Sequence, residues 1–298
     1  GYTNVEIEIQ SRAATVTRME NLGDLKVELG SLTVKNATGA VHGELILDNG
    51  KLKLGEGADN LMAADSGALH LENGAHLDIG TTTQALSADN EVFLSGAASI
   101  TGDAAGPGLQ LADGVKVNYE DAGNSIDAKM TVEQGITLNS TQSNSSLEIS
   151  GVISGSGALN LTGQGSVALS GANADFDGQV TVQQGATLTL QNTDALLNAG
   201  VTLNAGATLA LDAPGTVNID TLTFLSGSSL AISTISGTDE SSALHAVLNA
   251  EQGVTFGGEL NLIFSGNLKT LTTYNIMTGV SSLDGLSVNV THNGVALD

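Results

Sequence analysis

The chain contains no cysteine, no tryptophan and only 2 prolines among its 298 residues, and aromatic residues make up only 3% of it. The absence of cysteine excludes a disulfide framework. A compact globular core normally relies on large aromatic side chains, which dominate the energetics of burial. Here the apolar residues are Ala, Val, Leu and Ile, spread evenly along the chain. This composition is typical of a thin, repetitive core.

Basic residues are also scarce, since 9 Lys and Arg stand against 32 Asp and Glu, for a net charge of −23. No Lys or Arg occurs between Lys129 and Lys269. Nucleic-acid binding depends on clustered Lys and Arg, so this class of function is excluded. The same scarcity argues against attachment to an anionic membrane surface. The acidic surface is explained by solubility through self-repulsion.

Long hydrophobic runs are missing as well. No stretch approaches the ~18 apolar residues that are needed to span a bilayer. The first ten residues, GYTNVEIEIQ, lack the basic start and apolar core of a signal peptide. We therefore expect either a protein that is not exported or a mature fragment, and the repeats described next favour the fragment.

An internal repeat is the dominant order in the sequence. The stretch VTVQQGATLTLQ (180–191) reappears as VTLNAGATLALD (201–212). Similar copies with a central glycine recur about every 21 residues, which is the signature of a repeat architecture. The other central glycines are Gly50, Gly74, Gly96, Gly114, Gly135 and Gly227.

Each copy predicts two short strands that meet at a glycine corner. In the alternating segments, residues i and i+2 point to the same face, so Leu lies inside and Thr or His outside. Glycine at the corner permits the positive φ of a sharp turn. The predicted corner residues are Gly50, Gly74, Gly114, Gly135, Gly185 and Gly206.

Such a unit predicts an all-β fold, a right-handed parallel β-helix (solenoid). Eight or nine coils from about Asp24 to Asp212, each ~4.8 Å from the next, give a rod of roughly 40 Å. A β-sandwich is the alternative, because its short strands also recur at regular intervals. The recurrence of the same glycine register favours the solenoid.

Three regions are expected. Residues 1–23 form an N-terminal cap, 24–220 the β-helix repeats, and 221–298 a capping region of antiparallel β-strands. Bulky residues such as Phe256, Phe264 and Tyr274 concentrate in the last region. Terminal units of a solenoid must cover the exposed end of the core, which explains this change in composition.

The segment ISGSGALNLTGQGSVALSGANADFDGQVTVQQGATLTLQN (153–192) carries a family resemblance. It resembles the autotransporter-associated β-strand repeat of bacterial autotransporter passengers. The matching positions are Gly155, Gly157, Leu159, Leu161, Gly163, Gly165, Leu169, Ser170, Gly171, Asn173, Phe176, Gly178, Val182, Gly185, Leu188 and Leu190. The specific motif covers about 40 residues, and a looser likeness, including the tail after Val254, covers most of the chain.

This resemblance implies an exported passenger that is displayed on a bacterial outer-membrane surface or released from it. Members of the family are adhesins, self-association factors or scaffolds for catalytic domains. The implied partners are a host glycoprotein or glycan, or further copies of the protein. Neither the membrane barrel of an autotransporter nor a signal sequence is present in this segment, so we expect no direct membrane insertion by it.

The strongest catalytic candidate is Asp65, in Asp65-Ser66-Gly67. This triplet matches that of aspartic peptidases, in which a carboxylate activates water and needs a second carboxylate nearby, for example Asp103. A secreted peptidase or other hydrolase acting on host glycoprotein or mucin is therefore the alternative function. The same three residue types also suit a structural turn.

His70, His76 and Asp78 form a candidate metal site, because alternation places all three side chains on the outside. His70 precedes the corner at Gly74, so the three side chains can diverge, and solvated surface residues are the alternative. A divalent cation is the only cofactor that the sequence suggests. Among other carboxylates, Asp175 and Asp177 share a face but lack the aromatic platforms usual in glycosidases. The sequence thus favours a non-enzymatic protein that serves adhesion, self-association or display.

Overall fold

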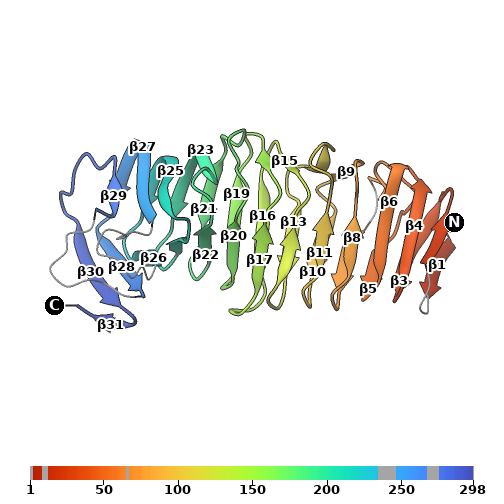
Figure 1. The fold of residues 1–298 in the computed structure, drawn as a ribbon, viewed down its shortest axis with the longest axis horizontal. Coiled ribbons are helices and arrows are strands. Elements are labelled where there is room, and N and C mark those ends of the chain that lie inside the picture. The colour runs from red at the N-terminus through yellow and green to blue at the C-terminus, as the bar shows by residue number, and fades with distance from the viewer. Residues whose placement is uncertain (1–2, 9–12, 65–66, 234–245, 267–274, 298) are drawn as a thin grey trace.

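The computed structural model describes residues 3–8, 13–64, 67–233, 246–266 and 275–297. In this part of the chain all regular structure is β. The strands stack into a long rod, and the N- and C-termini lie at its opposite ends (Figure 1). No helix that could cross a membrane occurs among these residues. The fold is a parallel β-solenoid, as the repeat predicted, and the β-sandwich alternative is wrong.

Two long sheets run along the rod, and a short third sheet lies in its N-terminal half. In spatial order, sheet 1 contains β1 (Thr3–Glu8), β3 (Leu22–Glu28), β5 (Leu45–Asp48), β7 (Leu69–Glu72), β10 (Glu91–Leu94), β13 (Lys116–Tyr119), β16 (Ile136–Ser140), β19 (Leu159–Thr162), β21 (Gln179–Val182), β23 (Leu196–Leu203), β25 (Gly215–Phe224), β27 (Ala246–Phe256) and β29 (Met277–Thr278). Sheet 2 contains β2 (Ala13–Val16), β4 (Ser31–Asn36), β6 (Lys51–Gly57), β8 (His76–Asp78), β11 (Ser99–Thr101), β14 (Asn124–Ile126), β17 (Ser146–Ile149), β20 (Ser166–Leu169), β22 (Thr187–Leu190), β24 (Thr208–Leu211), β26 (Ser228–Ser233), β28 (Glu259–Ser265), β30 (Ser287–His292) and β31 (Val295–Ala296). Sheet 3 contains β9 (Thr83–Leu86), β12 (Gly108–Leu111), β15 (Met130–Val132) and β18 (Ile153–Ser154).

Successive coils pair in parallel, with apolar residues above one another. Val180 of β21 pairs with Val201 of β23, and Val201 with Leu222 of β25, which reproduces the repeat of the sequence. Between Asp24 and Asp212 the structure has about nine coils, in agreement with the expected eight or nine. At about 4.8 Å per coil, these coils give the expected rod of roughly 40 Å.

The core is one continuous aliphatic column from Met19 to Leu262. Alternation decides which side chains enter it, as in β22, where Leu188 and Leu190 are buried while Thr187 and Thr189 are half-exposed. The largest fully buried side chains include three aromatic ones, Tyr119, Phe176 and Phe224. The remaining volume is filled by Leu, Ile, Val and Ala, as the composition predicted.

The glycine corners differ from the prediction in two ways. Gly74, Gly185 and Gly206 have positive φ between strands of sheet 1 and sheet 2, as expected. Gly114 also has positive φ, but it lies with Gly135 between sheet 3 and sheet 1, where the Gly114 amide donates to the Gly135 carbonyl at 2.7 Å. These two glycines follow the same spacing in the sequence as the others, but they form a corner between a different pair of sheets.

Gly50 and Gly135 do not use the left-handed conformation. At Gly50 the positive φ is carried by the preceding Asn49, and glycine is required because a Cβ would lie 2.5 Å from the Val27 carbonyl oxygen of the neighbouring coil. At Gly135 a Cβ would lie 3.2 Å from Oδ1 of Asp113, which is the end of a side chain. The explanation by positive φ is wrong at these two positions.

This difference between corners predicts a difference in stability. Replacing Gly206 (φ +76°) with Ala should lower the free energy of unfolding by about 1–2 kcal/mol, because a Cβ disfavours the left-handed conformation. Replacing Gly135 with Ala should change the free energy of unfolding by less than about 0.5 kcal/mol. Urea unfolding curves of the two variants measure both effects, and equal losses would contradict the assignment of the corners.

The parallel ladder extends further than expected. After Thr221 parallel pairing continues through β25–β27, β26–β28 and β28–β30. The coil here contains more residues than in the repeats, since Leu222 lies opposite Val254. The expected C-terminal antiparallel strands are present as β30 and β31, where Thr291 lies opposite Ala296. In the rest of the described part of 221–298 the strands pair in parallel, so the antiparallel pairing is less extensive than expected. At the other end, β1 and β2 pair in parallel with β3 and β4 and belong to the same ladder.

Candidate functional site

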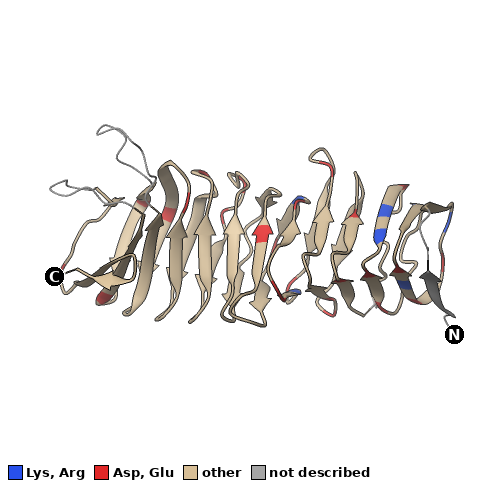
Figure 2. Ribbon diagram, turned by 60° about the horizontal axis from the view of Figure 1, so that its bottom comes forward, with Lys and Arg blue, Asp and Glu red and all other residues tan. Residues whose placement is uncertain are grey.

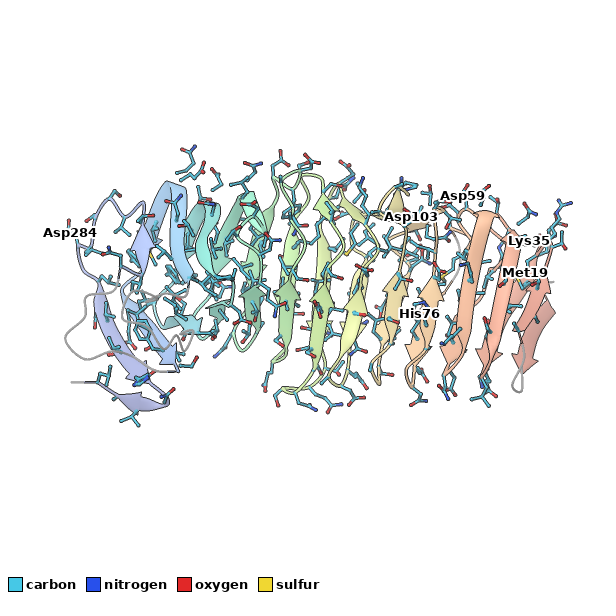
Figure 3. All side chains as sticks on the ribbon, viewed as in Figure 1. Met19, Lys35, Asp59, His76, Asp103 and Asp284 are labelled. Atoms are coloured by element: carbon cyan, nitrogen blue, oxygen red, sulfur yellow. The ribbon has the colours of Figure 1, made fainter. Side chains whose placement is uncertain are left out.

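Asp65 and Ser66, the core of the catalytic candidate, lie outside the described residues. Of the neighbours that the structure describes, the amide of Gly67 donates to the Gly43 carbonyl at 3.0 Å. Asp103, suggested as a second carboxylate, lies in an exposed turn where its Oδ1 accepts a hydrogen bond from the Ala105 amide at 2.9 Å (Figure 3). The role of Asp65 remains a prediction.

The three candidate metal ligands lie on two different sheets. His70 belongs to β7 of sheet 1, whereas His76 and Asp78 belong to β8 of sheet 2. The His70 ring stacks on Phe93 of the next coil, with ring centroids 4.7 Å apart, and its Nδ1 lies 3.6 Å from Glu72. The corner at Gly74 thus separates His70 from the other two side chains.

His76 and Asp78 already have protein partners. Nδ1 of His76 lies 2.8 Å from the Ser99 hydroxyl, and Nε2 lies 3.4 Å from that of Thr101 (Figure 3 labels His76). Asp78 accepts a hydrogen bond from the Gly80 amide and pairs with Nζ of Lys53 at 3.2 Å. Among the residues that the structure describes, no three His, Cys, Asp or Glu side chains are placed to hold a metal ion.

Glycoside hydrolysis needs paired carboxylates, and two open grooves on the described surface lack them. A groove of about 340 Å³ on sheet 3 is lined by Ala85, Leu86, Gln110, Leu111, Ala112, Thr131 and Glu133. Glu133 is its single ionisable side chain. A second groove of about 310 Å³, near the C-terminal end, has an apolar lining that includes Phe256, Leu262 and Met277. Neither lining contains the two carboxylates required for acid–base hydrolysis of a glycoside.

The candidate carboxylates Asp175 and Asp177 are both exposed and flank the buried Phe176. Their backbone groups connect coils, since the Gly155 amide donates to the Asp175 carbonyl and the Asp177 amide to the Gly155 carbonyl. The repeat explains why Asp175 and Asp177 are outside: Phe176 between them points into the core, and their backbone groups bond to the neighbouring coil.

The motif of the β-strand repeat forms one structural unit around Asn173 and Phe176. Asn173 is fully buried, its Oδ1 accepts from the Ile153 amide at 2.7 Å, and its Nδ2 donates to the Ala195 carbonyl at 2.9 Å. Glycine is required at position 178 because a Cβ there would clash with the Gly157 carbonyl oxygen of the neighbouring coil and would also lie 2.8 Å from the Phe176 ring. The motif residues are therefore explained by contacts between coils.

Outer polar residues form ladders along sheet 1. Asn139 donates to Asn118 and accepts from Thr162, both at 2.9 Å, and Asn204 donates to Gln183 at 2.6 Å. These side chains satisfy one another across neighbouring coils.

The sequence analysis did not identify two aromatic side chains, Phe93 on the outside of the rod and Tyr119 in its core. Phe93 faces outward, although few exposed aromatics were expected, and the alternation of Val92 and Leu94 as inner residues could have revealed it. Tyr119 is buried at the end of β13, and burial raises the pKa of its hydroxyl to about 12, while a hydrogen bond with Ser140 lowers it in part.

Tyr119 makes the stability depend on pH in the alkaline range. The folded chain holds the phenolic proton more tightly than the unfolded chain, so this stabilisation is complete below pH ~10 and is lost as the pH rises towards about 12. We expect a loss of about 2 kcal/mol over this range, and Tyr119→Phe should abolish it. Urea unfolding at several alkaline pH values measures the slope, and an unchanged slope in Tyr119→Phe would assign it to other groups.

Comparison with known proteins identifies no relative. No protein-family model, no curated protein and no solved structure gives a significant match to the chain. The function is therefore inferred from the architecture and from the repeat motif.

Proposed function

We propose that this chain is a passenger-type β-solenoid of the bacterial cell surface or extracellular space, which serves adhesion, self-association or display. The observation that carries the proposal is that sheets 1 and 2 each form a long parallel ladder and enclose one hydrophobic core along most of the chain. Such a rod has a defined length and shape, and every coil adds another row of outward side chains.

The repeat motif supports the same function. Three residues of the motif, Asn173, Phe176 and Gly178, are explained by packing: Asn173 bonds to a neighbouring coil, Phe176 is buried in the core, and Gly178 lies close to the Gly157 backbone. The resemblance to autotransporter passengers thus agrees with the packing. We propose that the partners are host glycoproteins or glycans, or further copies of the protein.

The proposal is tested by displaying the chain on non-adherent bacterial cells through a heterologous anchor. Cells that carry the chain should aggregate or be retained on mucin- or glycan-coated surfaces, whereas cells with the anchor alone should not. Absence of both effects would contradict an adhesive function. Cleavage of mucin or casein by the purified chain, lost in Asp65→Asn, would favour a hydrolase instead.

A further inference from the structure

One part of the outer face of sheet 1 carries acidic residues without basic ones. Among the described residues, all Lys and Arg lie in the N-terminal half of the rod, at or before Lys129 (Figure 2). Within that half, residues 44–48, 68–72 and 91–95, which contain β5, β7 and β10, include no Lys or Arg. Their carboxylates are Glu44, Asp48, Glu72 and Glu91. This part of sheet 1 is therefore negative, although lysines occur nearby on sheet 2.

A row of apolar and aromatic side chains runs through the middle of the same face. The strand register places Ile46 beside His70, and His70 beside Phe93. All three side chains are half-exposed, and the His70 and Phe93 rings stack with their centroids 4.7 Å apart. Further along the rod the row becomes polar, with Asn118 and then Asn139. We call Ile46, His70 and Phe93 the ridge.

Carboxylates flank the ridge on both sides. Along β5 the outward residues are Glu44, Ile46 and Asp48, which are separated by buried leucines. The flanking carboxylates of the next two coils are Glu72, on the side of Asp48, and Glu91, on the side of Glu44. Residues two positions apart in a strand lie about 6.6–6.8 Å from each other. Strand β5 thus presents a carboxylate, an apolar group and a second carboxylate at this spacing.

Most of these carboxylates lack a basic partner. Among the described residues, Glu44, Asp48 and Glu72 form no ion pair with Lys or Arg, whereas Glu91 lies 3.4 Å from Lys116. Asp48 accepts a hydrogen bond of 2.7 Å from a neutral asparagine amide, and Glu72 lies 3.6 Å from the ridge histidine. The complement of this face is a partner with cations on both sides of an apolar group.

An extended protein segment has the spacing that this face requires. In an extended chain, alternate side chains point to one side and lie about 6.6–6.8 Å apart. A segment with the pattern Lys-x-Val-x-Lys therefore presents a cation, an apolar group and a cation at the spacing of Glu44, Ile46 and Asp48. When the segment lies along β5 at the ~10 Å distance of packed sheets, each cation lies over a carboxylate and the apolar group contacts the ridge. Because the pattern is symmetric, both chain directions fit.

We propose that this face of sheet 1 binds an extended basic segment of a partner protein, in which two Lys or Arg flank an apolar residue at alternate positions. The inference rests on the proposed adhesive function and names the chemistry of a protein partner. One such segment covers far less than the ~800 Å² per partner of a standard interface, so a single contact is weak. Many copies of the chain on one surface make the attachment strong.

The test is a titration of the isotope-labelled full chain with the peptide Ser-Lys-Ser-Val-Ser-Lys-Ser, blocked at both ends and followed by NMR at ~0.15 M salt. The amide resonances that shift should be those of β5 and of the strands beside it. The control peptide Ser-Ser-Lys-Val-Lys-Ser-Ser has the same composition, but its lysines point away from the side that carries the valine. It should bind at least about 5-fold more weakly, because it cannot form both ion pairs.

Two double variants of equal net charge locate the site. Glu44→Gln/Asp48→Asn should weaken binding of the first peptide about 3–10-fold. Glu133→Gln/Glu148→Gln, which alters no residue of sheet 1, should bind the peptide like the wild type. Ile46→Thr, which keeps a β-branched side chain, should weaken binding about 3-fold through the loss of apolar contact.

The outcomes separate this inference from the proposed function. Equal binding of the two peptides, equal weakening by the two double variants, or shifts along the whole rod would overturn the inference, because each indicates attraction by net charge alone. Absence of binding would overturn it as well. In these cases, retention of displaying cells on mucin or glycan surfaces would still support adhesion. If the peptide binds as expected and the cells are not retained, the face is correct and the glycan partner is wrong.

Discussion

Replacing Phe176 with Ala is expected to lower the free energy of unfolding by about 3–5 kcal/mol, the cost of removing a buried phenyl ring and leaving a cavity. Phe176 is fully buried, and a Cβ at position 178 would lie only 2.8 Å from its ring. In a solenoid, each coil is supported by its two neighbours, so a cavity in one coil weakens three. The loss is measured by urea unfolding followed by circular dichroism.

Phe93→Ala provides the matched control for this prediction. Phe93 is the same residue type but lies on the outer face, half-exposed and stacked on His70. Its replacement should lower the free energy of unfolding by about 1 kcal/mol or less. If the two variants lose the same stability, Phe176 does not fill the core as described.

Replacing Asn173 with Ala is expected to lower the free energy of unfolding by about 2–5 kcal/mol. The amide of this side chain connects two backbone groups of adjacent coils, the Ile153 N–H and the Ala195 carbonyl, in a fully buried position. Each buried backbone group left without a partner costs about 1–3 kcal/mol. Urea unfolding and hydrogen exchange at Ile153 measure the effect.

Asn173→Asp separates the hydrogen bonds from the volume of the side chain. The aspartate retains the size of the side chain but cannot donate to Ala195 when ionised, so we expect a loss comparable to that of Asn173→Ala at neutral pH. Asn160→Ala is the control, since Asn160 is half-exposed and its bond to Ile136 is 3.4 Å long. A large loss in the control, or none in Asn173→Asp, would contradict this explanation.

These predictions bear on the interpretation of the repeat motif. Its residues are those that the packing of parallel coils requires, so any sequence that builds such coils is under the same constraints. The motif therefore argues for the architecture and, through the family resemblance, for a passenger-type function. Under the proposed function, binding depends on the outward residues, which vary from coil to coil.

The candidate metal ligands show that closeness in the sequence does not predict which side chains lie together in a solenoid. His70, His76 and Asp78 lie within nine positions of one another, yet the corner at Gly74 sends them to two sheets. Lys51 and Glu148 are far apart in the sequence, yet they occupy one row of sheet 2. Residues that act together in a solenoid are neighbours across coils, and short motifs cannot identify them.

The sequence by itself determined the fold class, the aliphatic core and the side of each strand that faces it. These properties follow from local alternation and from a repeat of nearly constant length, and both are visible in segments such as 180–191 and 201–212. The charge imbalance, and with it the expectation that the chain does not bind nucleic acid, likewise follows from composition alone.

Only the tertiary structure decided which residues lie above one another, where sheet 3 interrupts the repeat, and how far the ladder continues. The reason is that the coils differ in length, so that Ser125 pairs with Glu148 rather than with Ser146 of the same strand. The register is chosen by the fit of the apolar residues and the corners of all coils together. The rows of outward side chains on sheet 2 follow from that choice.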